Sequence, residues 1–142
     1  MFMLISNNED LCNHVKSSKF IEGSALDVLI HVRGFVHLGS ILLTHPLCGN
    51  LRPYQQPFRS VIIDSKNGLV DLESLSLIED AVHVYESCKL INVNELDELK
   101  RVDYAYIDYE LMRESLERYK LINRESSLAP APLLLQNLKE GL

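Results

Sequence analysis

The sequence predicts an α/β fold, a three-layer sandwich with a short, mostly parallel sheet and further helices towards the C-terminus. Short apolar segments rich in branched residues alternate with longer stretches whose apolar positions recur at helical spacing. The chain has 142 residues, of which 46% are hydrophobic, so it is long enough to bury a core of this kind. We expect one α/β domain over residues 1–122, followed by a Pro-containing tether and a short apolar segment over 123–142.

Four short apolar segments are predicted to form the strands. The first is a buried strand that ends at a run of serine and asparagine, and the second is a weaker candidate. The third and fourth are rich in β-branched residues and enclose a long loop. They are Phe2–Ile5, Phe20–Ile21, Ile41–Thr44 and Val61–Ile63.

The first two helices are predicted from their capping residues. Either Asn7 or Asn8 can cap a short helix that follows the first strand. Ser24 and Asp27 have the spacing of a capping box at the start of a longer helix. Gly39 then ends that helix, because glycine is the usual residue just past a helix C-terminus.

Two more helices are expected in the second half of the chain. Asp71 is predicted to cap a long helix whose apolar side chains form one stripe. A further helix is expected to start near Asp103 or Asp108 and to run to Lys120.

Charge is distributed unevenly along the chain. The formal net charge is −6. Residues 1–70 carry six basic and five acidic side chains, whereas residues 71–142 carry eight and fifteen. An acidic C-terminal half argues against nucleic acid or an anionic membrane as the main partner.

The cysteines and the N-terminus indicate a cytoplasmic protein. Cys12, Cys48 and Cys88 are odd in number and widely spaced, which is typical of free thiols in a reducing compartment and gives no zinc pattern. The apolar start of the chain stops at residue 6 and lacks the length of a signal peptide. No apolar run approaches the length of a membrane span.

Candidate functional residues cluster in two segments that follow strands. In parallel sheets ligands bind beyond the carboxyl ends of the strands, and the segments Ser6–Asn8 and His45–Phe58 are both expected there. Three prolines in the second segment favour an ordered loop. The predicted ligand-binding residues are Ser6, Asn7, Asn8, Thr44, His45, Cys48, Gly49, Asn50, Arg52 and Arg59.

The loop chemistry suggests an anionic ligand. Arg52 and Arg59 can clamp a carboxylate or phosphate with forked donors, and a turn at Gly49-Asn50 can direct amide N–H groups at an anion. His45 would then donate a hydrogen bond. In the alternative interpretation, these side chains bind loop carbonyls and only hold the loop in place.

Two catalytic or metal-binding interpretations of the same loop are weaker. Cys48 as a nucleophile would require a lowered thiol pKa from a nearby base such as His45, which lies three positions away. A metal site of His37, His45 and Cys48 lacks a second thiol or a histidine pair at helical spacing. We therefore expect neither a metal nor another cofactor.

The central segment also resembles a known family. The run L-T-H-P-L-C-G over residues 43–49, the R-P pair at 52–53 and P-F-R-S at 57–60 are similar to the central part of GrdX-like proteins. The opening L-I-S-N-N at 4–8 and D-L-E-S-L-S-L-I-E at 71–79 are similar as well. These small proteins are encoded alongside glycine, sarcosine and betaine reductase components in amino-acid-fermenting bacteria. The resemblance implies this context and no mechanism.

Two functional hypotheses follow. The first is an accessory or regulatory protein of such a reductase system, which binds a small anionic metabolite at the 45–59 loop, with a reductase component as a possible partner. The second is an enzyme that acts on a small acyl or amino-acid substrate with His45 and Cys48 in its site. The leucines at 133–135 and 138 lie beyond the tether, so we expect a homodimer formed through the C-terminal half.

Overall fold

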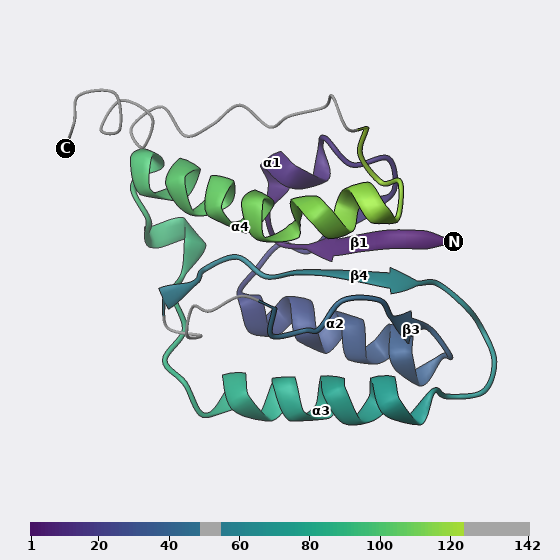
Figure 1. Ribbon diagram of the computed structural model, residues 1–142. Helices are drawn as coiled ribbons and strands as arrows, with labels where there is room; N and C mark the ends of the chain where they lie inside the picture. The colour runs from purple at the N-terminus through teal and green to yellow at the C-terminus, as the bar shows by residue number, and fades with distance from the viewer. Residues whose placement is uncertain (49–54, 124–142) are drawn as a thin grey trace.

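The computed structural model describes residues 1–48 and 55–123 of the chain. Within these ranges the elements are strands and helices in the order strand, helix, strand, helix, two strands and two helices (Figure 1). Their bounds are β1 Phe2–Ser6, α1 Glu9–Cys12, β2 Ser18–Phe20, α2 Ala25–His37, β3 Ile41–Leu42, β4 Ser60–Asp64, α3 Leu72–Glu86 and α4 Glu98–Arg118. The predicted residues Gly49, Asn50 and Arg52, and the predicted tether beyond Asn123, lie outside the described residues.

The four strands form one sheet in the order β2-β1-β4-β3. Only β1 and β2 pair in parallel, whereas β4 is antiparallel to both of its neighbours. The prediction of a mostly parallel sheet is therefore wrong, and the sheet is mixed. The reason is that β4 pairs with β3 as an antiparallel neighbour, so the chain returns in the opposite direction after β3.

Three of the strands nevertheless run in the same direction. β4 is antiparallel to β1 and to β3, so β1, β2 and β3 all end at one edge of the sheet. The segments that follow these strands meet there, and the chain enters β4 at the same edge. Ser6–Asn8 and the loop after β3 therefore both start at this edge, although the sheet is mixed.

Helices cover both faces of the sheet, which gives the predicted three layers (Figure 1). Neighbouring strand residues point to opposite faces, so Ile5 packs beneath α2 and α3 while Leu4 packs beneath α4. The strand β4 alternates in the same way, with Val61 and Ile63 in the first core and Ile62 in the second. The central strands β1 and β4 therefore contribute side chains to a core on each face of the sheet.

The capping predictions for the helices α1, α2 and α3 are confirmed. Asn8 caps α1, and Asp71 caps α3. Ser24 and Asp27 form a reciprocal capping box at the start of α2. Gly39 follows the end of that helix with φ of 111°, a conformation that side chains with a Cβ rarely adopt.

The last described helix starts earlier than the sequence indicates. The helix α4 begins at Glu98 with Asp97 as its cap, whereas Asp103 and Asp108 were the predicted starts. Its first turns are polar and were therefore not part of the apolar pattern. They are stabilised instead by charged pairs, because Arg101 binds Glu98 of its own helix and Asp10 of α1. Among the residues that the structure describes, no helix is both long enough and apolar enough to span a bilayer.

Candidate functional site

Asn7 connects the segments that meet at the common edge of the sheet. Its side chain is almost fully buried. The amide Nδ2 donates to the carbonyl oxygens of Gly23 and Pro57, each at 3.0 Å. The Oδ1 accepts the backbone N–H of Arg59 at 2.8 Å. Asn7 therefore fixes the entry to β4 and the entry to α2 against the end of β1. The described parts of the two predicted segments, Ser6–Asn8 and His45–Phe58, lie side by side at this point.

Ser6 and Asn8 belong to a buried polar network beneath this edge. The hydroxyl of Ser60 donates to Asp108 Oδ2 at 2.7 Å, and Asn8 Nδ2 donates to the same oxygen at 3.0 Å. Because the single Ser60 proton is used there, Ser6 Oγ donates to Ser60 Oγ at 2.7 Å and accepts the N–H of Asn8 at 2.9 Å. These four side chains join β1 and β4 to α4.

Asp108 is the buried acid of this network. Burial raises its pKa, while the hydrogen bonds from Asn8 and Ser60 and the charge of Arg59 act in the opposite direction. The sequence pointed to Asp108 only as a possible helix start. Its partners lie 48 and 100 residues away along the chain, so no local pattern indicates the network.

Arg59 is buried and its donors are already engaged. Nε and Nη2 donate to the hydroxyl of Tyr85 at 3.1 and 2.7 Å, and Nη2 also donates to Gln56 Oε1 at 2.9 Å. Nη1 donates to the carbonyl of Cys48 at 2.7 Å. The side chain is 2% exposed. This geometry matches the alternative interpretation of the loop, in which the arginine holds the loop in place.

The other described loop residues make local contacts. Thr44 Oγ1 accepts the N–H of Ile62 at 3.0 Å, which extends the β3–β4 pairing. The exposed His45 accepts the N–H of Leu47 on Nδ1 at 3.0 Å, and its carbonyl accepts the N–H of Cys48. The imidazole nitrogen nearest the backbone is thus occupied by the turn itself.

The metal interpretation receives no support within the described ranges. His37 lies on α2 and approaches Glu79 of α3 at 3.4 Å. Within residues 1–48 and 55–123, no group of three or more His, Cys, Asp or Glu side chains is arranged to hold a metal ion. Cys12 is buried, and burial raises the pKa of its thiol to about 11.

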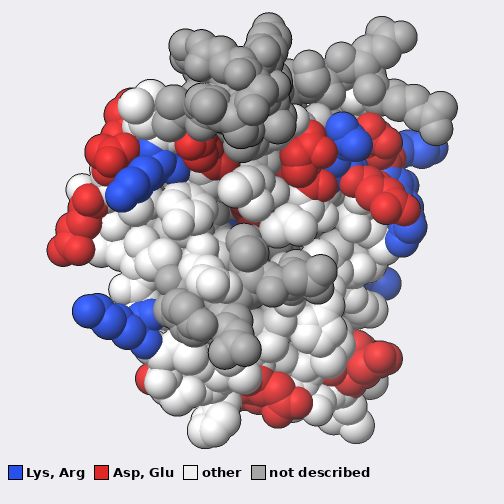
Figure 2. Space-filling model, turned by 60° about the vertical axis from the view of Figure 1, so that its left-hand side comes forward, with Lys and Arg blue, Asp and Glu red and all other residues white. Residues whose placement is uncertain are grey.

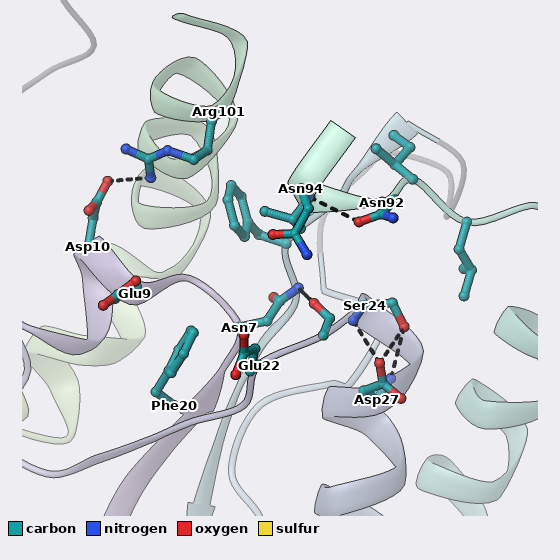
Figure 3. Close-up of a pocket in the computed structure, with 15 residues that line it drawn as sticks. Asn7, Glu9, Asp10, Phe20, Glu22, Ser24, Asp27, Asn92, Asn94 and Arg101 are labelled. Carbon is teal, nitrogen blue, oxygen red and sulfur yellow. Dashed lines mark hydrogen bonds and ion pairs between the residues drawn. The ribbon is translucent and has the colours of Figure 1, made fainter. Parts of the chain in front are cut away.

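An open cavity of about 770 Å³ lies at the carboxyl end of β1 and β2 (Figure 3). Its lining comes from the starts of α1, α2 and α4, from the entry to β4, and from residues 90–94 ahead of α4. Of the predicted site residues that the structure describes, Asn7 alone lines it. Phe58, at the end of the predicted loop, lines it as well.

The lining carries an excess of negative charge. Four carboxylates contribute to it, those of Glu9, Asp10, Glu22 and Asp27, against the single guanidinium of Arg101 among the described lining residues. Acidic and basic side chains are both visible around the margin of the face that includes this end of the molecule (Figure 2).

Two of these carboxylates already have partners. Arg101 donates to Asp10 at 3.0 Å and to Glu98 at 2.7 and 3.0 Å. The pKa of Arg101 is raised, first by the hydrogen bond to Glu98, so the guanidinium remains charged. Asp27 accepts from the N–H and the hydroxyl of Ser24. The exposed Glu9 and Glu22 form no ion pair with the described residues.

Glu9, Phe20 and Glu22 are not among the residues that the sequence predicts for the site. Glu9 was assigned to a helix start, and Phe20 to a strand. The rule that led to Ser6–Asn8 would also have identified Phe20 and Glu22, because they lie at and just beyond the end of the second strand.

Comparisons with known proteins give one result. A family model described as "GrdX-like protein" matches residues 3–117 of the chain. Neither the curated proteins nor the solved structures contain a match.

Proposed function

Because the chain belongs to the GrdX-like family, we propose that it is an accessory or regulatory protein of a glycine, sarcosine or betaine reductase-type fermentation system. In this proposal the protein binds a small metabolite in the cavity at the carboxyl end of β1. The cavity is the observation that carries the proposal. Its volume of about 770 Å³ lies in the range of ligand sites, and it occupies the edge where α/β sheets bind ligands.

The buried polar side chains behind the cavity are held in place by hydrogen bonds, which supports binding there. Asn7, Arg59 and Asp108 have hydrogen-bond partners within the protein, so they form a fixed frame behind the cavity. A preformed frame lowers the cost of ordering on binding. The ligand would contact the exposed side chains in front of that frame.

The contacts of the loop favour binding over catalysis. His45 Nδ1 accepts a backbone N–H, so this nitrogen does not activate the thiol of Cys48 in the observed geometry. Arg59 is occupied by Tyr85, Gln56 and a backbone carbonyl. We therefore place the proposed ligand in the cavity rather than on Arg59. The predicted contribution of Arg52 lies outside the described residues.

A ligand screen monitored by NMR tests this proposal. We expect fermentation metabolites to include one that shifts the amide signals of residues 7–10, 20–24 and 91–94, while the signals of residues 65–72 at the other end of the sheet stay in place. A ligand at one hundred times its Kd should also stabilise the fold by about 2.7 kcal/mol. The proposal fails if no metabolite binds, or if the shifts cluster away from the cavity.

The proposed role also includes contact with a reductase component. We expect the purified protein and the components of such a system to form a complex in analytical ultracentrifugation. A mixture in which every component sediments independently, with and without the ligand, would remove this part of the proposal.

A further inference from the structure

We infer that the ligand of the cavity carries a positively charged nitrogen, an ammonium or a quaternary ammonium group, held between Glu9, Phe20 and Glu22. This inference rests on the proposed function and specifies the class of its ligand. It differs from the anionic ligand that the sequence predicts, and it is drawn from the side chains that line the cavity.

The described lining of the cavity carries more negative than positive charge. The single guanidinium of the described lining, on Arg101, is neutralised by Asp10 and Glu98. Glu9 and Glu22 have no such partner among the described residues, so they add unpaired negative charge to the described lining. A cation entering the cavity would be attracted by both carboxylates, whereas an anion would be repelled by them.

Phe20 adds an exposed aromatic ring to the same lining. Phe20 is 42% exposed, although it is a large apolar side chain at the end of a strand. Its ring is seen between Glu9 and Glu22 in the cavity view (Figure 3). An aromatic face attracts cations through its quadrupole, and aromatic side chains are the usual means of binding quaternary ammonium groups.

The opposite wall supplies hydrogen-bond donors for the rest of the ligand. Asn92 uses its Oδ1 to accept the N–H of Asn94 at 3.0 Å, which leaves its amide NH₂ group as a donor. Both asparagines line the cavity and are exposed. A zwitterion, with its cationic end at Glu9 and Glu22 and its carboxylate at these amides, therefore fits the lining better than a simple anion.

Calorimetry with four small probes tests the charge requirement. The probes are choline, betaine, acetate and 3,3-dimethylbutanol, which is the neutral isostere of choline. We expect choline or betaine to bind about tenfold more tightly than the isostere or acetate, and we expect the affinity to fall as salt is added because the cavity is open.

Single substitutions then locate the cation. Glu22→Gln and Glu9→Gln should each weaken binding of the cationic probe by about two- to fivefold, the range of partly exposed ion pairs. The matched control is Glu73→Gln on α3, an exposed acid outside the cavity lining, which should leave binding unchanged.

The outcomes separate this inference from the proposed function. If acetate or the neutral isostere binds in the cavity as tightly as choline and betaine, the inference is wrong while the proposed function stands. The same holds if Glu22→Gln and Glu9→Gln bind the cationic probe as well as the unmodified protein does. If the probes and the metabolite screen both give no binding at the cavity, both are wrong.

Discussion

Replacing Arg59 by alanine should destabilise the protein instead of only removing a ligand contact. The guanidinium donates to three acceptors in or beside the core, the hydroxyl of Tyr85, Gln56 Oε1 and the carbonyl of Cys48. Both Tyr85 and Gln56 are almost fully buried. Arg59→Ala would remove this donor from all three acceptors, two of which are on buried side chains.

The magnitude follows from the contacts. A buried polar group left unpaired costs about 1–3 kcal/mol, so the two buried acceptors amount to roughly 2–6 kcal/mol. Removing a buried charge relieves a desolvation cost of several kcal/mol, which offsets part of this loss. We expect a net loss of about 2–4 kcal/mol, a large share of the roughly 5–15 kcal/mol that stabilises a domain.

Urea denaturation followed by circular dichroism measures this loss directly. Arg33→Ala is the matched control, because the half-buried Arg33 pairs with Glu79 at 3.7 Å and should change stability by less than about 1 kcal/mol. Arg59→Lys should restore little of the lost stability. The ammonium group of lysine lacks the planar, forked donors with which the guanidinium reaches three acceptors. If Arg59→Ala unfolds at the same urea concentration as the unmodified protein, the structural role assigned to Arg59 is wrong.

Three further outcomes are expected. Gly39→Val should lower the thermal midpoint in calorimetry, because φ is 111° and a Cβ would lie 2.6 Å from the nitrogen of Gly68; an unchanged midpoint would contradict this. Burial raises the pKa of Asp108, so its contribution to stability is present below its unfolded pKa of about 4 and is lost as the pH rises. Urea titrations should therefore show stability falling less from pH 4 to pH 7 for Asp108→Asn than for the unmodified protein, and equal slopes would refute this. Truncation after Ser127 should lower the sedimenting mass if the C-terminal leucines form the predicted dimer; equal monomeric masses would exclude it.

The helix starts and the strands were predictable because their signals are local. Ser24 and Asp27 lie within one turn of each other, and the cap Asp71 directly precedes its helix, so sequence spacing alone indicates both. The start of α4 has a local cap as well, Asp97, but its first turns are polar and carry no apolar stripe that would mark them as helical. The pair of Arg101 with Asp10, which is 91 residues distant in sequence, adds stability that no local pattern shows.

The strand order and the role of Arg59 depend on contacts that local patterns do not encode. The apolar run of β4 is compatible with any position in a buried sheet, and its insertion between β1 and β3 follows from the antiparallel return of the chain. In the sequence, Arg59 lies in a loop whose composition predicts an anion-binding site. Only the packing of Tyr85, 26 residues later, makes it a buried structural side chain.

The segment after β1 explains why the predicted site and the observed cavity share one residue. Asn7 and Asn8 are adjacent, yet they fix different parts of the molecule. Asn7 binds the backbone at Pro57 and Arg59, and Asn8 binds α4 through Asp108. Side chains used in this way are fully satisfied, so they position the cavity without offering free groups to a ligand. The groups left for recognition are the exposed side chains around them, and these are mainly acidic, aromatic and amide groups.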